Sequence, residues 1–170
     1  MPTVPRAQVT ARLLLRGFDA AYQRLRPYVT DPHSLPDDAF LPLFEALNWL
    51  VVLSDLARAS GDPVPVDPDD LLGLRFARNR THHQWAMALE AKDFALPPPP
   101  RVVLAGGRRG GRVVQVRPVS ARAWAWVPAH QLPPGRRQPK LERAYAARLG
   151  GKPAFEVLDR VFASLAPLRT

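Results

Sequence analysis

A run of four prolines, Pro97 to Pro100, separates two stretches of the chain that have different patterns. Before the run, apolar residues recur at the spacing of an α-helix, and after it short β-branched runs alternate with glycine pairs. A polyproline run is an extended spacer, so it is the clearest internal boundary. The sequence predicts a helical core over residues 1–96 and a second part over residues 97–170, packed on the same domain.

Three helices are expected before the prolines. The first runs from about Thr10 to Tyr28, because apolar residues recur near i, i+4 and i+7; these are Leu13, Leu14, Phe18, Tyr22 and Leu25. The second begins at Asp37 or Asp38 and ends near Ser60. The third is expected from about Asp70 to Ala91, with Asp67 or Asp69 as its N-cap.

After the prolines the pattern predicts strands and then helices. Residues 101–104 and 112–116 are expected to form a hairpin joined through glycines, and residues 120–127 a third strand. Two short helices are expected at about 139–149 and 153–166, with Pro153 in the first turn of the last one. The predicted fold class is mainly α: a helical bundle with a small β-hairpin insertion and two short C-terminal helices.

The positive charge lies mostly in the second part of the chain. Residues 1–100 carry 10 Lys and Arg against 12 Asp and Glu, giving −2, whereas residues 101–170 carry 14 against 3, giving +11. This asymmetry predicts an anionic partner, with nucleic acid as the first candidate; a merely solvated basic face is the alternative. The predicted nucleic-acid-binding residues are Arg108, Arg109, Arg112, Arg122, Arg136 and Arg137.

The composition excludes several other classes. The chain has no cysteine, so disulfides, zinc knuckles and thiol catalysis are excluded. The first residues lack the apolar stretch of a signal peptide, and the longest apolar run, Leu47 to Leu53, is too short to span a bilayer. The sequence therefore predicts a cytoplasmic protein without membrane contact.

The candidate site is a polar cluster inside the third expected helix. At 100° per residue, its polar side chains form an arc between two apolar faces, which predicts a cleft or an interface. The arc contains Arg75, Arg78, Asn79, His82 and His83. One row of the second helix carries Glu45, Asn48, Val52 and Asp55. If the two helices pack antiparallel, these rows face each other, and a carboxylate could orient an imidazole. The alternative is a buried polar network that only fixes helix register.

The sequence from Arg78 to His83 resembles the Arg-polar-x-x-x-His signature of HEPN-domain ribonucleases, many of which are prokaryotic toxins or defence effectors. On this resemblance, Arg78 matches the motif arginine, Asn79 its polar partner and His83 its histidine. The resemblance covers about residues 8–95. It implies a HEPN-like helical bundle, a metal-independent endoribonuclease without cofactor, a homodimer, and an antitoxin or a regulatory protein as a further partner.

RNA carries its own nucleophile, the 2′-OH, so cleavage needs a general base, a cation at the phosphate and an orienting donor. His83 would be the base or acid, Arg78 the cation and Asn79 the donor, with Arg75, His82, Glu45, Asn48 and Asp55 in support. Arg78 and His83 lie about 140° apart on an ideal helix. Two copies of the chain related by a twofold axis would bring Arg78 of one near His83 of the other.

Two alternatives remain open at this point. The first is a non-catalytic dimeric helical protein that binds nucleic acid or a regulatory partner through the same basic surface. The second concerns Trp124 and Trp126, which are either a platform on which bases stack or a filling of the core. A metal site at His82 and His83 is not expected, because adjacent helical residues diverge by about 100°.

Overall fold

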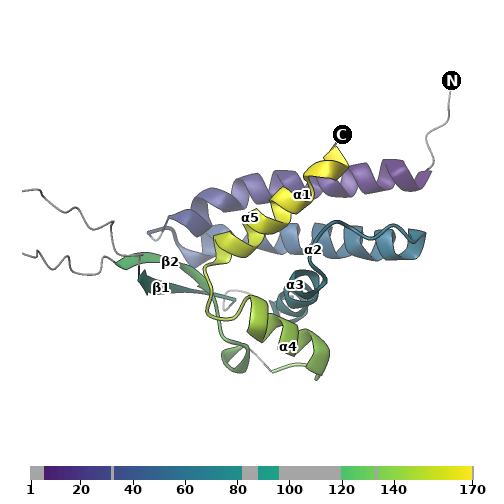
Figure 1. Cartoon of the computed structure of the whole chain (residues 1–170). Helices are drawn as coiled ribbons and strands as arrows, with labels where there is room; N and C mark the ends of the chain where they lie inside the picture. The colour runs from purple at the N-terminus through teal and green to yellow at the C-terminus, as the bar shows by residue number, and fades with distance from the viewer. Residues whose placement is uncertain (1–5, 32, 82–87, 96–119, 133, 170) are drawn as a thin grey trace, which may run out of the picture.

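The computed structural model describes residues 6–31, 33–81, 88–95, 120–132 and 134–169 (Figure 1). Within them the chain forms helices α1 (Arg6–Thr30), α2 (Pro36–Ser60), α3 (Pro68–Thr81), α4 (Pro139–Arg148) and α5 (Ala154–Ser164). The strands are β1 (Leu89–Ala95) and β2 (Ser120–Trp126), and two short 3₁₀ segments are η2 (Ala129–Gln131) and η3 (Ala166–Arg169). The predicted class, mainly α with a small antiparallel sheet, is confirmed.

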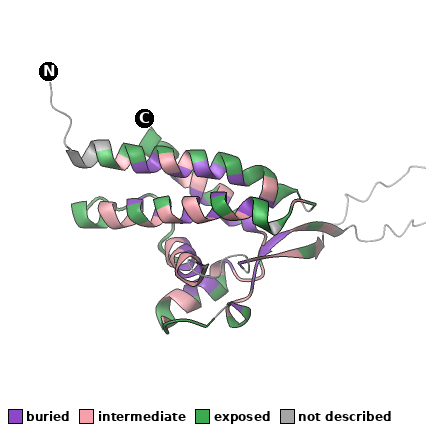
Figure 2. Cartoon of the chain, turned by 180° about the vertical axis from the view of Figure 1, so that it is seen from behind, coloured by how far each residue is buried: buried purple, intermediate pink, exposed green. Residues whose placement is uncertain are grey.

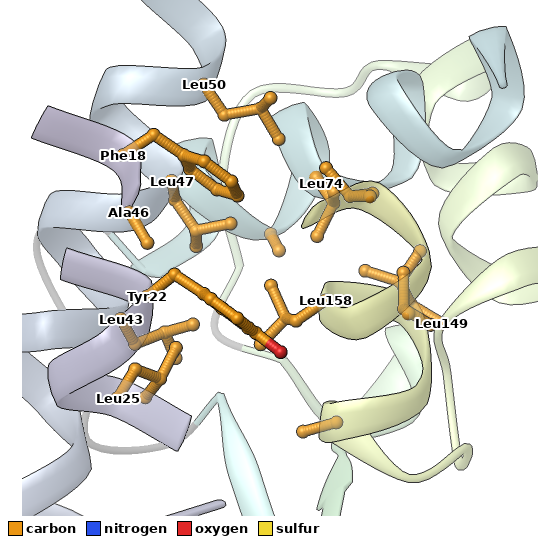
Figure 3. Packing of buried hydrophobic residues seen from close by; sticks show 14 of the residues in the cluster. Phe18, Tyr22, Leu25, Leu43, Ala46, Leu47, Leu50, Leu74, Leu149 and Leu158 are labelled. Atoms are coloured by element: carbon orange, nitrogen blue, oxygen red, sulfur yellow. The ribbon is translucent and has the colours of Figure 1, made fainter. Parts of the chain in front are cut away.

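The helices form layers around one apolar core. In Figure 1, α1 and α2 lie side by side, α3 crosses below α2 and is seen almost end-on, and α4 lies beneath α3. Helix α5 lies across α1. Phe18, Tyr22, Leu47, Leu74 and Leu158 meet between these helices, and all are 2% exposed or less (Figure 3). Since the helices come from both sides of the proline run, the two parts of the chain share this core.

The first two helices agree with their predicted patterns. Leu14 and Phe18 of α1 are buried as expected, but Leu13 is 60% exposed and faces outward (Figure 2 shows the exposed outer faces of α1 and α2). Helix α2 ends at Gly61, whose φ of 78° is left-handed and whose N–H bonds to the last turn. Glycine is favoured there because a Cβ disfavours positive φ.

Helix α2 is also the one helix among the described residues that is long and apolar enough to cross a membrane, counted over Asp37–Ser60. Its residues Leu43, Ala46, Leu47 and Leu50 are buried in the core (Figure 3). Packing inside the bundle therefore accounts for much of its apolar character, and the helix is compatible with a soluble protein.

The small sheet differs from its prediction in one of its two strands. Strand β2 confirms the strand expected over residues 120–127, but its antiparallel partner is β1, with Leu89 opposite Trp126 and Ala95 opposite Ser120. The prediction that the third helix continues to Ala91 is therefore wrong, because Ala91 lies in β1 opposite Trp124. The hairpin strands predicted at 101–104 and 112–116 lie outside the described residues.

A close contact joins α3 to α4, and an ionic network joins α3 to both α4 and α5. A Cβ on Gly73 would lie 2.6 Å from Leu149 Cδ1, so the glycine allows α3 and α4 to approach closely. Asp70, only 1% exposed, accepts hydrogen bonds from Arg148 Nε at 2.8 Å and from Arg160 Nε at 2.8 Å and Nη2 at 3.1 Å. One carboxylate thereby links α3 to α4 and α5.

Candidate functional site

The position of the site depends on where α3 begins. Asp67 precedes the helix, and its Oδ1 accepts hydrogen bonds from the backbone N–H groups of Asp69 at 2.8 Å and Asp70 at 3.3 Å. Pro68 is the first helical residue, a position where its missing N–H costs nothing. Asp67, one of the two predicted N-caps, therefore caps the helix that carries Arg75, Arg78 and Asn79.

Two polar residues of α2 meet α3 as the row pattern predicted. Asp55 accepts hydrogen bonds from both terminal nitrogens of Arg75, with a distance of 3.3 Å to Nη1, and it also pairs with Arg58. The guanidinium of Arg75 is thus paired with a carboxylate of α2. The helices cross rather than run antiparallel, so the rows meet only at Asp55 and at Asn48 (Figure 1).

Arg78 is held by neutral groups. Its Nε donates to Asn48 Oδ1 at 2.9 Å, and its Nη1 donates weakly to Asn79 Oδ1 at 3.4 Å. The amide of Asn48 is itself oriented, because its Nδ2 donates to the backbone oxygen of Phe44 at 2.9 Å. Among the described residues Arg78 forms no ion pair. Its guanidinium is therefore oriented by amides while its positive charge is not neutralised by a carboxylate.

Asn79 connects this arginine to the start of α4. Its Nδ2 donates to Gln138 Oε1 at 3.0 Å, and Gln138 is the residue immediately before α4. A second contact lies beside it, because a Cβ on Gly135 would be 2.4 Å from Arg80 Nη1. The segment from Gly135 to Gln138 therefore lies against the C-terminal end of α3.

This segment brings exposed basic residues to the same end of α3. Arg136, Arg137, Lys140 and Arg143 are all exposed, and within the described part of the chain none of them forms an ion pair. Arg122, on β2, is exposed as well. Unpaired cations of this density give a surface an attraction for anions that falls with added salt.

Glu45 does not join this group. It pairs with Arg24 of α1, and the imidazoles that its carboxylate was expected to orient, His82 and His83, lie outside the described residues. The geometric reason is that α1 packs along the whole length of α2 and covers that side of the Glu45 row, whereas α3 crosses α2 only locally (Figure 1).

The two tryptophans fill the core. Trp124 is 5% exposed and Trp126 is fully buried. The indole nitrogen of Trp124 donates to the backbone oxygen of Asp31 at 3.1 Å and to Ser34 Oγ at 3.0 Å. Since neither ring presents a free face, the base-stacking interpretation is excluded and the core-filling interpretation is confirmed.

Several predicted site residues, namely His82, His83, Arg108, Arg109 and Arg112, lie outside the described residues. Gln138 is the contact that sequence reasoning missed, because an isolated glutamine in a proline- and arginine-rich connection has no pattern that points to α3. Comparison of the chain with protein-family models, with curated proteins and with solved structures finds no match.

Proposed function

We propose that this protein is a metal-independent endoribonuclease of the HEPN type. The observation that supports it most is Arg78, a guanidinium aligned by Asn48 and Asn79 and without a carboxylate partner among the described residues. A cation that is oriented but not neutralised can bind a phosphate and stabilise the negative charge that develops as the phosphodiester is cleaved. A purely structural arginine would be expected to hold a carboxylate, as Arg75 does with Asp55.

In the proposed reaction the 2′-OH of one ribose attacks the adjacent phosphorus. A base removes the 2′-OH proton, the bond from phosphorus to the 5′-oxygen breaks, and an acid protonates that leaving oxygen. His83 is the proposed proton carrier, since imidazole exchanges protons near neutral pH. Arg78 is the proposed charge clamp and Asn79 the orienting amide. The products are a 2′,3′-cyclic phosphate and a 5′-hydroxyl end, and no metal enters the balance.

The proposed active form is a homodimer. Arg78 lies in α3 and the expected proton carrier His83 follows the end of that helix at Thr81, and we propose that the two residues act on one phosphate from different copies of the chain. A twofold axis near the C-terminal end of α3 would let Arg78 of one copy and His83 of the other act on the same group.

A second candidate function, binding of nucleic acid without cleavage, is favoured by a different observation. Part of the hydrogen-bonding capacity of the proposed site is used inside the fold, because Asn79 bonds Gln138 and Arg78 bonds Asn48. The exposed cations Arg136, Arg137, Lys140 and Arg143 would bind RNA phosphates without any contribution from a proton carrier.

The deciding experiment measures cleavage of mixed cellular RNA by the purified protein in EDTA. Arg78→Ala and His83→Ala should each lower the rate by about 10²- to 10³-fold, the usual effect of removing one group that stabilises the transition state. Arg16→Ala is the matched control, because Arg16 is exposed on α1 and forms no ion pair among the described residues. Far-UV circular dichroism checks that each variant is folded.

Cleavage that survives in both variants, or that requires added metal, would contradict the proposal. RNA binding without cleavage by the wild type, weakened by Arg136→Ala and Arg137→Ala, would favour the second candidate. Loss of cleavage in both variants with the control unchanged would support the nuclease.

A further inference from the structure

A hollow lies between η2 and the start of α4. Its volume is about 440 Å³, within the range of small-molecule sites. Four of its lining side chains can be charged or polar: His130 from η2, and Arg137, Glu142 and Arg143 from the connection to α4 and from α4 itself. Pro139 and Ala146 supply apolar wall.

The hollow shares the start of α4 with the contact to α3. Arg137 and Pro139 both line it, and Gln138 between them is the residue that accepts the hydrogen bond from Asn79. Glu142, Arg143 and Ala146 of α4 line the hollow, whereas Ala144 and Tyr145 pack against Gly73 of α3, so the hollow opens on a different face of α4 from the one that contacts α3.

The lining groups have the chemistry of a nucleotide site. Two guanidinium groups bind a phosphate, and neither Arg137 nor Arg143 is neutralised by an ion pair in the described part of the chain. Glu142 would repel a bare phosphate, so its presence on the lining favours a ligand that also carries N–H donors. A guanine base presents two adjacent donors, N1–H and the N2 amino group, to one carboxylate, whereas uracil presents a single N–H.

We propose that this hollow binds a guanine nucleotide. Arg137 and Arg143 hold its phosphate, and the Glu142 carboxylate accepts from the Watson–Crick edge of the base. This binding does not depend on the proposed nuclease function.

Binding to the full-length protein is measured by isothermal titration calorimetry with guanosine monophosphate (GMP), uridine monophosphate (UMP) and inorganic phosphate. GMP is expected to bind at least about 10-fold more tightly than UMP, as one additional hydrogen bond to a charged group would give. Arg137→Ala and Arg143→Ala should each weaken GMP binding by about 10-fold, and Arg16→Ala should leave it unchanged. Glu142→Gln should remove the preference for GMP over UMP and strengthen phosphate binding.

Equal affinity for GMP and UMP, or GMP affinity that is unchanged in Arg137→Ala and Arg143→Ala, would overturn the proposal. Strengthened GMP binding in Glu142→Gln would also overturn it, because the carboxylate would then only repel phosphate. The two proposals are separable. A protein that binds GMP in the expected pattern but cleaves no RNA keeps this inference and loses the nuclease, and Arg78→Ala should lose cleavage while it keeps GMP binding.

Discussion

Removing the charge of the buried Asp70 should destabilise the fold. The carboxylate is 1% exposed and accepts three hydrogen bonds from Arg148 and Arg160. Removing one partner of a buried ion pair typically costs 3–5 kcal/mol. The two arginine side chains are 34% and 46% exposed, so water can solvate them in the variant. We therefore expect Asp70→Asn to lower the free energy of unfolding by about 3 kcal/mol, at the low end of the range.

The assay is urea unfolding at about pH 7 followed by far-UV circular dichroism, with thermal unfolding in parallel. For a chain of this length, about 3 kcal/mol corresponds to a fall in Tm of about 6–12 °C. Asp69→Asn is the matched control, because Asp69 is exposed in the same first helical turn but forms no ion pair with an arginine in the described part of the chain. The control should change the free energy of unfolding by less than about 0.5 kcal/mol.

The pH dependence gives an independent check. Burial by itself would raise the pKa of Asp70, but the hydrogen bonds and charges of Arg160 and Arg148 outweigh it and hold that pKa below its usual value. Because the pKa is lower in the folded state, the stabilisation is complete above the unfolded value of about 3.9 and is lost as the pH falls through the folded value. The difference between wild type and Asp70→Asn should therefore persist from about pH 5 to 8 and close only below about pH 4.

The reasoning would be refuted if Asp70→Asn cost no more than Asp69→Asn. It would also be refuted if the difference between wild type and Asp70→Asn stayed constant well below about pH 4, since a protonated Asp70 can no longer hold the arginines by charge.

Two further predictions concern the core and the assembly. Tyr145→Phe should cost about 1–2 kcal/mol in urea unfolding, because the buried phenol donates to the backbone oxygen of Val127 at 2.6 Å. Burial and the nearby charge of Glu90 raise the pKa of Tyr145, so this difference should shrink only above about pH 10, where the unfolded phenol ionises. In light scattering the homodimer should appear at twice the 18.9 kDa mass of the chain. A single species of 18.9 kDa at micromolar concentration would count against the dimer. Trp49 and Val52 are exposed apolar residues on α2, so Val52→Asp tests whether that face joins the two copies.

Sequence periodicity predicted the helices well where apolar rows are long. Helices α1, α2, α4 and α5 all lie close to their predicted ranges, and the apolar row of α1 is the clearest of these patterns. The third helix was extended too far because residues 89–95 include Leu, Glu, Ala and Lys, all favourable in helices. Pairing with β2 overrides that local preference, and the β1–β2 contact spans a sequence separation that periodicity cannot detect.

The polar row of α2 was predicted in part. Asn48 and Asp55 do meet Arg78 and Arg75, because residues seven apart on α2 return to the same side of the helix. Glu45 lies on that row too, yet it pairs with Arg24, because α1 rather than α3 packs against α2 at the position of Glu45. The crossing angle of two helices depends on how the side chains of both helices pack into each other, so it cannot be predicted from the residue pattern of one helix.

The pairing of β1 with β2 brings the two ends of the basic segment between them together. Ala95 and Ser120 are opposite each other, so the 24 residues from 96 to 119 begin and end at neighbouring positions. Loop closure costs free energy only as the logarithm of length, so a turn of about four residues would lower that cost by about 1.6 kcal/mol. The excised segment holds five arginines and no acidic residue, which would take the net charge from +9 to +4. A shorter and less basic connection could therefore join the same two strand ends.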